Sequence, residues 1–231
     1  MTLDYSKHKA ILLQILKDVF SDTAIAPYLG FKGGTAALLF YGLDRKSIDL
    51  DFDLLDNSKE AVVFEKIEII VSNYGKVVDS RIKRFNLINV ISYDLKSQNI
   101  KVEVNRRNFG SRYELQTFLG ISMLVMVKED MFANKLMAMY ERIGKTSRDI
   151  FDVYFFAKNN WPINKAMVEQ RLGISFKDLL VRCIALLEKM DNRRILEGLG
   201  EFITKSQKDW ARAKLRADTI FQLKLMLESE T

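Results

Sequence analysis

The chain has 231 residues, of which 48% are hydrophobic and 29% are charged. These proportions are typical of a folded globular protein and exclude an intrinsically disordered one. No apolar run approaches the roughly 20 residues that a membrane-spanning helix needs, and the charges that flank the N-terminal apolar stretch indicate an amphipathic helix rather than a signal peptide. We therefore expect a cytoplasmic protein with no membrane partner. The net charge of +6 fits a nucleotide or RNA partner, although many soluble proteins are equally basic.

The chain contains one cysteine, Cys183, and one histidine, His8. A single cysteine excludes an internal disulfide, and the apolar helical pattern around Cys183 indicates a small core residue. One cysteine and one histidine cannot form a structural zinc site. They also argue against a hydrolase built on a Ser-His-Asp or Cys-His arrangement.

The N-terminal half mixes helical and strand patterns. Apolar spacing predicts a helix over residues 5–20, and a short strand over 29–32 leads into Gly33-Gly34. A short helix follows, with Thr35 as its expected cap and Gly42 as its C-terminal stop. Strict alternation predicts a strand over 47–54. The rest of this half comprises a helix over 58–74, strands over 76–83, 87–93 and 100–105, and turns near Asn86 and over 96–99.

From about residue 127 the pattern is almost entirely helical. Helices are expected over 129–143, 147–158, 164–171, 176–190 and 207–228. The predicted fold class is therefore α+β. A mixed β-sheet with flanking helices forms a domain over residues 1–120, and a helical bundle forms a second domain over residues 121–231.

The predicted strand over 47–54 carries four polar residues on one face: Ser47, Asp49, Asp51 and Asp53. Strand residues i and i+2 lie roughly 6–7 Å apart on the same side, so Asp49 and Asp51 present two carboxylates to one place. Their repulsion disappears if they share a divalent cation, and magnesium prefers one or two carboxylates plus waters and phosphate oxygens. We interpret Asp49 and Asp51 as catalytic metal ligands. Asp53 is expected to be a supporting or solvated residue, and Ser47 to hydrogen-bond a phosphate or the metal's water shell.

Gly33 and Gly34 precede this strand by one short helix. Because they lack side chains, their backbone can approach a ligand closely, and the helix that follows offers free N–H groups to an anion. Thr35 adds a hydroxyl donor. Each motif alone is more often structural than functional. Together, in this order, they indicate a turn that holds the β- and γ-phosphates of a nucleoside triphosphate beside carboxylates that hold its metal ion.

The stretch LGFKGGTAALLFYGLDRKSIDLDFDLL, residues 29–55, resembles the signature of the nucleotidyltransferase superfamily. More closely, it resembles the AbiEii/AbiGii-type nucleotidyltransferase toxins. Their first motif is Lys-Gly-Gly-Thr followed by Arg-x-Ser-x-Asp-(Leu/Ile)-Asp-Phe, and this chain matches it at Lys32, Gly33, Gly34, Thr35, Arg45, Ser47, Asp49, Asp51 and Phe52. Two later motifs match at 134–138 with Arg142, and at 148–154. The resemblance spans roughly residues 29–157.

This resemblance implies a nucleotidyltransferase-like sheet, with the helical domain completing the active site. The implied reaction transfers a nucleoside monophosphate from a nucleoside triphosphate to an acceptor, with magnesium as the cofactor and manganese as the alternative metal. It implies tRNA or another RNA as the acceptor, and the toxin of a bacterial toxin–antitoxin or abortive-infection pair with a separate antitoxin. The alternative is a nucleotide- or RNA-binding module that has lost catalysis, against which the intact Asp49 and Asp51 argue.

The motifs of the resemblance imply further site residues. Lys32 and Arg142 are implied to bind substrate. Lys135 lies in an otherwise apolar helix; it could extend harmlessly to solvent, but the resemblance favours a catalytic lysine whose charge acts on the triphosphate.

Asp149 and Asp152 are three residues apart and therefore lie on one helix face. Lys135 is the natural partner of Asp152. Asp149 is implied to bind substrate, and one of the two aspartates is a candidate general base, with Asp152 preferred.

Related polymerase-like enzymes carry a third metal-binding carboxylate, for which Glu103 is the best candidate here. The alternative for Glu103 is an ion pair with Lys101 or a nearby arginine. Two basic regions could face RNA: Arg106, Arg107 and Arg112 in one, and Lys205, Lys208, Arg212, Lys214 and Arg216 around Trp210 in the other. For the second region we favour an ordinary amphipathic helix with Trp210 packed inside.

Overall fold

A computed structural model describes residues 4–94 and 98–230. Contacts divide the chain into two compact units. The first unit is Met1–Gly42 together with Ser47–Met126, and the second is Leu43–Lys46 together with Val127–Thr231. The loop Leu43–Lys46 thus belongs to the helical unit, although the chain on both sides of it belongs to the sheet unit. The predicted α+β class is confirmed.

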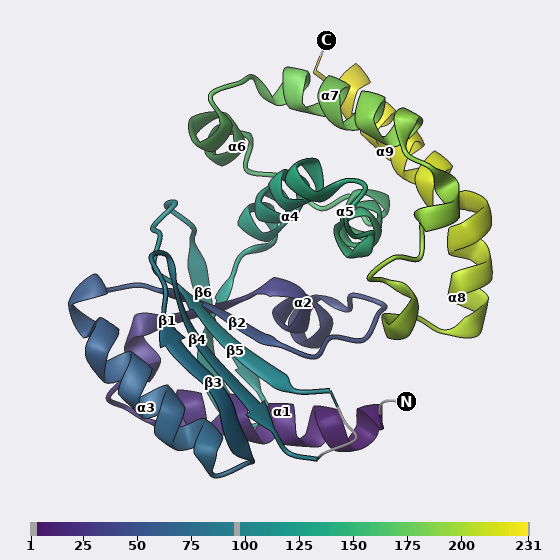
Figure 1. The fold of residues 1–231 in the computed structure, drawn as a ribbon. Helices are drawn as coiled ribbons and strands as arrows, with labels where there is room; N and C mark the ends of the chain where they lie inside the picture. The colour runs from purple at the N-terminus through teal and green to yellow at the C-terminus, as the bar shows by residue number, and fades with distance from the viewer. Residues whose placement is uncertain (1–3, 95–97, 231) are drawn as a thin grey trace. The chain divides into compact units, whose positions relative to one another are not determined.

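In the first unit, seven strands of the described residues form one mixed sheet with the order β3-β4-β5-β2-β1-β7-β6 (Figure 1). Strand β2 pairs antiparallel with β1 and parallel with β5, and β1 also pairs parallel with β7. The strands are β1 Leu29–Lys32, β2 Leu50–Leu54, β3 Lys76–Ile82, β4 Asn86–Ser92, β5 Ile100–Asn105, β6 Tyr113–Phe118 and β7 Ile121–Met126. The sequence analysis assigned no strand to β6 or β7. The turn expected over 96–99 falls partly on residues 95–97, outside the described residues.

Helices α1 (Tyr5–Ser21) and α3 (Glu60–Ser72) pack against each other and against strands of the sheet (Figure 1). Phe20 of α1 meets Phe31 of β1 and Phe52 of β2, with ring centroids 5.4 to 6.3 Å apart within this trio. The apolar face of β2 therefore points into the core. Since side chains alternate along a strand, Asp51 and Asp53 project from the other face. Short 3₁₀ turns occur at Ala26–Tyr28 and Asn57–Lys59.

Helix α2 spans Gly33–Tyr41, so it begins two residues earlier than expected. The expected cap at Thr35 is wrong: Lys32 precedes the helix, and no side-chain hydrogen bond caps this described N-terminus. Thr35 instead lies inside the first turn. The stop at Gly42 is confirmed, with φ of 72° and its N–H donated to the carbonyl of Ala37.

The second unit consists of helices α4 Lys128–Arg142, α5 Arg148–Lys158, α6 Lys165–Leu172, α7 Phe176–Lys189, α8 Lys205–Trp210 and α9 Arg216–Glu228. Short 3₁₀ turns occur at Asn192–Arg194 and Gly200–Phe202. Helix α4 packs on α5, α5 on α9, and α7 on α9. A π-helical segment, Ala211–Leu215, joins α8 to α9 where one helix over 207–228 was expected.

Cys183 is buried in α7, and burial raises the pKa of its thiol to about 12, which confirms the predicted core residue. Across residues 4–94 and 98–230, every helix falls short of the length and apolar character needed to cross a bilayer.

Candidate active site

Asp51 lies at the centre of the sheet. Its partner in β1 is Lys32, and its partner in β5 is Glu103. Directly opposed residues of paired strands project from the same face, so these three side chains share the face opposite Phe52. The structure therefore places Asp51, Lys32 and Glu103, which the sequence analysis had selected by separate arguments, in one row across three strands.

Gly33, the first residue of α2, lies directly against Asp51. A Cβ built on Gly33 would lie 2.5 Å from Asp51 Oδ2, and φ of this glycine is +78°. The first N–H groups of a helix have no partner within the helix, and they attract anions. The anion site at the start of α2 and the carboxylate of Asp51 are thus adjacent, an arrangement that suits a phosphate and the cation that accompanies it.

Asp49 lies one residue before β2 and is fixed through its backbone. Its carbonyl oxygen accepts a hydrogen bond of 2.5 Å from Thr35 Oγ1, which also lies 2.9 Å from Ser47 Oγ. The carbonyl of the preceding Ile48 accepts a hydrogen bond of 3.0 Å from Nε2 of His8. Burial lowers the pKa of His8, and the hydrogen bond to the Ile48 carbonyl opposes this shift without cancelling it. Thr35 is buried, and the structure gives its hydroxyl a supporting role behind Asp49.

Lys101 of β5 is drawn into the same acidic region. Burial would lower the pKa of Lys101, but the charges of Asp51, Glu103 and Asp49, with a hydrogen bond to Glu103, raise it above its ordinary value. The Lys101 Nζ lies 2.5 Å from Glu103 Oε2, and Asn86 Nδ2 donates to Glu103 Oε1 at 2.7 Å. The pairing of Glu103 with Lys101 is therefore confirmed, and both oxygens of Glu103 are engaged.

Among the residues that the structure describes, no three His, Cys, Asp or Glu side chains converge as metal ligands. The structure thus does not bring Glu103 together with Asp49 and Asp51 in a three-carboxylate centre. The chemistry of the pair still fits magnesium, which needs only one or two carboxylates when phosphate oxygens and waters complete its shell. The charges of Asp51, Glu103 and Asp49 raise the pKa of Lys101, so these carboxylates favour a positive charge beside them.

Asp53 is buried and fully engaged. It accepts hydrogen bonds from Lys32 Nζ at 2.5 Å, from Asn105 Nδ2 at 2.6 Å and from the hydroxyl of Tyr113. The structure therefore gives Asp53 a supporting role, as expected, and not a solvated one. Lys32 neutralises Asp53 in this state, and its assignment to substrate stays a prediction.

The second unit contains a chain of alternating charges. The guanidinium of Arg45 pairs with both oxygens of Asp152, with Nε 2.6 Å from Oδ1 and Nη2 2.7 Å from Oδ2. Lys135 Nζ lies 2.7 Å from Asp152 Oδ2 and 3.3 Å from Asp149 Oδ1. Arg142 Nη2 lies 2.8 Å from Asp149 Oδ2. The predicted pairing of Lys135 with Asp152 is confirmed, and the order of the chain is Arg45–Asp152–Lys135–Asp149–Arg142.

The charges in this network shift the pKa values of Asp152 and Lys135. Burial alone would raise the pKa of Asp152, but Arg45 and Lys135 lower it to about 2. Burial alone would lower the pKa of Lys135, but Asp152 and Asp149 raise it. At neutral pH Asp152 is therefore ionised and Lys135 protonated. A carboxylate with so low a pKa and no exposed surface is a weak general base, so the geometry favours a positioning role for Asp152.

The profile of the family described as nucleotidyl transferase AbiEii toxin, type IV toxin–antitoxin system, matches residues 14–221. The chain belongs to this family. Membership confirms the resemblance carried by the glycine and aspartate motifs, and it implies a cognate antitoxin. No curated protein matches the chain.

Two crystal structures from Helicobacter pylori share the fold. One, provisionally described as a nucleotidyltransferase, is 20% identical, with 99% of this chain and 97% of that chain covered and a TM-score of 0.63. The other, JHP933, is 19% identical, with 99% and 94% covered and a TM-score of 0.61. At such identities the likeness establishes the fold alone.

The sequence analysis missed several residues that support the family motifs. Arg45 was noted only as a motif position, and its partner Asp152 is 107 residues away. His8, Asn105 and Tyr113 were assigned no role at the site. Each of these contacts joins different elements of the fold, so no local spacing could have revealed them.

Proposed function

We propose that the protein is a magnesium-dependent nucleotidyltransferase that transfers a nucleoside monophosphate from a nucleoside triphosphate to RNA, with tRNA as the first acceptor to test. The observation that carries this proposal is the close approach of Gly33 to Asp51, which puts an anion site beside a carboxylate. Membership of the AbiEii family supports the class of reaction. Manganese is the alternative metal, because it accepts similar oxygen ligands.

In the proposed reaction, an acceptor hydroxyl oxygen bonds to the α-phosphorus and its proton passes to solvent water. The bond between the α-phosphorus and the oxygen that bridges it to the β-phosphorus breaks, and pyrophosphate leaves. Gly33 and Gly34 orient the triphosphate through backbone N–H groups. Asp49 and Asp51 would hold the divalent ion, which would neutralise charge on the triphosphate. Thr35 keeps Asp49 in place through the hydrogen bond to its carbonyl.

Lys135 and Arg142 are the proposed cations of the helical unit. The charges of Asp152 and Asp149 keep Lys135 protonated, as a lysine that acts on phosphate must be. An ammonium carries three N–H donors. Asp152 and Asp149 take two of them among the contacts of the described residues, which leaves a third for a phosphate oxygen. Arg142 is half-exposed beyond its contact with Asp149.

The test is incubation of the protein with each α-labelled nucleoside triphosphate, magnesium and total tRNA. We expect labelled RNA with the wild type, loss of labelling on removal of magnesium, and at least a hundredfold slower labelling with Asp49→Asn. Asp79→Asn is the matched control, because it removes the same charge from the edge strand β3 of the same sheet.

Tight nucleotide binding without transfer to RNA or protein would instead support the second candidate, a binding module without catalysis. Transfer that survives both Asp49→Asn and magnesium removal would refute the assignment of the metal ligands. Unfolding midpoints of both variants, measured by circular dichroism, separate loss of chemistry from loss of fold.

A further inference from the structure

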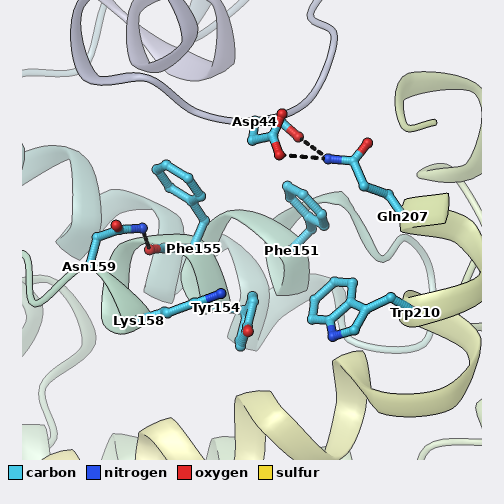
Figure 2. Close-up of a pocket in the computed structure, with 8 residues that line it drawn as sticks. All are labelled: Asp44, Phe151, Tyr154, Phe155, Lys158, Asn159, Gln207 and Trp210. Atoms are coloured by element: carbon cyan, nitrogen blue, oxygen red, sulfur yellow. Dashed lines mark hydrogen bonds between the residues drawn. The ribbon is translucent and has the colours of Figure 1, made fainter.

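The helical unit contains a pocket of about 350 Å³ whose lining includes Phe151 and Tyr154 of the motif at 148–154, but neither of that motif's aspartates (Figure 2). This volume lies at the lower end of the roughly 300–1,000 Å³ of small-molecule sites. Phe151, Tyr154, Phe155 and Lys158 of α5 line it, following the spacing of one helix face. The chain of alternating charges uses Asp149 and Asp152, which lie on a different face of α5. One helix therefore contributes to two separate sites.

The walls of this pocket are aromatic. The ring of Trp210, from α8, lies 4.9 Å from that of Tyr154 at an interplanar angle of 40°. It also meets Phe151 almost edge-on, with centroids 6.2 Å apart. Lys158 Nζ lies 5.6 Å from the centroid of the Tyr154 ring. Figure 2 shows these rings around the cavity, which therefore offers flat apolar surfaces with a cation at its edge.

The rim of the pocket is polar and held in place. Gln207 Nε2 donates to the carbonyl of Asp44 at 2.7 Å and to Asp44 Oδ2 at 2.9 Å. The side-chain oxygen of Gln207 accepts from the backbone N–H of Thr204, in the capping box that begins α8. The rim is thus preorganised before any ligand binds.

We propose that this pocket binds an unpaired nucleobase of the RNA acceptor, and this inference rests on the proposed use of RNA as acceptor. Unpaired bases are recognised by stacking on aromatic side chains and by hydrogen bonds to their edges. The pocket offers both, since the carboxylate of Asp44 can accept from base N–H groups. Lys158, which lines the pocket, supplies positive charge for an adjoining phosphate.

An aliphatic ligand suits this pocket less well. It would cover Asp44, Lys158 and Gln207 without hydrogen-bonding them, and burying polar groups without partners costs free energy. A nucleobase has a π-face for the rings and donors and acceptors for the rim. The base of the nucleoside triphosphate shares this chemistry, so the experiment must separate the two sources.

Trp210 provides a direct probe of occupancy. The chain has two tryptophans, and the other, Trp161, stacks on Phe156 at 4.0 Å and 9°. In a Trp161→Phe variant, all tryptophan fluorescence comes from the pocket. We expect a short single-stranded RNA to quench it saturably, and a blunt RNA duplex or a nucleoside triphosphate at the same concentration to leave it unchanged.

Lys158→Gln in the Trp161→Phe background should weaken single-stranded RNA binding several-fold and reduce its salt dependence, because a phosphate contact is lost. Lys189→Gln, an exposed charge loss on α7 of the same unit, is the matched control and should bind as the parent does. Tyr154→Leu should weaken binding at least fivefold, since base stacking contributes about 1–3 kcal/mol.

Three outcomes would overturn the inference. Quenching by the nucleoside triphosphate alone would assign the pocket to the donor nucleotide. Quenching by aromatic peptides but not by RNA would assign it to a protein partner. Absence of quenching by any of these probes would show that the rings merely pack together. If Trp161→Phe does not fold, the difference spectrum between wild type and Trp210→Phe gives the same information.

Asp49→Asn should not change the quenching, because binding in the pocket needs no catalysis. Quenching by single-stranded RNA in a protein that transfers no nucleotide would therefore support the pocket while refuting the proposed reaction. Transfer to RNA that is unaffected by Tyr154→Leu and Lys158→Gln would support the proposed reaction and refute the role of the pocket.

Discussion

Replacement of Gly33 by alanine tests whether the close contact between Gly33 and Asp51 is needed for nucleotide transfer. The new Cβ would lie 2.5 Å from Asp51 Oδ2, whereas nonbonded contacts of carbon are optimal at about 3.5–4.0 Å. The carboxylate must therefore retreat by about 1 Å, and a misplacement of about 1 Å can cost roughly a hundredfold in rate. The left-handed backbone at φ +78° adds a stability cost of about 1–2 kcal/mol for an L-residue.

Gly42→Ala is the control that isolates the steric effect. Gly42 lies at the other end of α2 with φ of +72°, and a Cβ there would meet nothing within 4 Å. Both variants should lose similar unfolding free energy in urea titrations, since both strain the same backbone region. Initial rates of nucleotide transfer should fall about a hundredfold in Gly33→Ala only. Equal rates in the two variants would refute the argument that the contact of Gly33 with Asp51 shapes the site.

Two further predictions concern the helical unit. Arg45→Met should cost about 3 kcal/mol of unfolding free energy, because it leaves the buried carboxylate of Asp152 with fewer cations. The depressed pKa of Asp152 stabilises the fold above pH 4 and less as pH falls toward 2. Arg45→Met raises the pKa of Asp152, so acid unfolding, followed by tryptophan fluorescence, should start at higher pH. A loss of unfolding free energy below about 1 kcal/mol would contradict the pairing of Arg45 with Asp152. Cys183 should resist thiol reagents at pH 8 until the helical unit unfolds, because burial raises its pKa to about 12; rapid labelling of the native protein would contradict this.

The sequence predicted the second part of the acidic strand correctly because its apolar face is buried, but the strand begins at Leu50 rather than at Ser47, so Ser47 and Asp49 precede it. Leu50, Phe52 and Leu54 are all buried in the structure, and this apolar row fixes which face carries the aspartates. A slip of one residue would turn the carboxylates toward the apolar core. The local pattern therefore determined the geometry of Asp51 and Asp53 without knowledge of the rest of the fold.

The hairpin of β6 and β7 was not predicted, because its strands lack an apolar row that marks one buried face. Strand β6 lies at the edge of the sheet, and its Leu115 is 71% exposed. Its apolar residues therefore do not mark a buried face. Strand β7 is a short apolar run, which periodicity alone cannot distinguish from a helical segment. The π-helical segment at Ala211–Leu215 was missed because its apolar spacing still resembles that of a helix.

The aspartates of the two motifs look alike in the sequence, and their counterions tell them apart. Asp152 lies within 2.7 Å of Arg45 and Lys135 and has no exposed surface, so these two cations neutralise its charge inside the protein. Asp51 lies against the backbone of Gly33, and the lysine attracted to it, Lys101, is already bonded to Glu103. Among the described residues, Asp51 shares the attraction of Lys101 with Glu103 and Asp49, and we propose that its remaining negative charge attracts an external cation. This difference is why we assign metal binding to the strand and charge positioning to the helix.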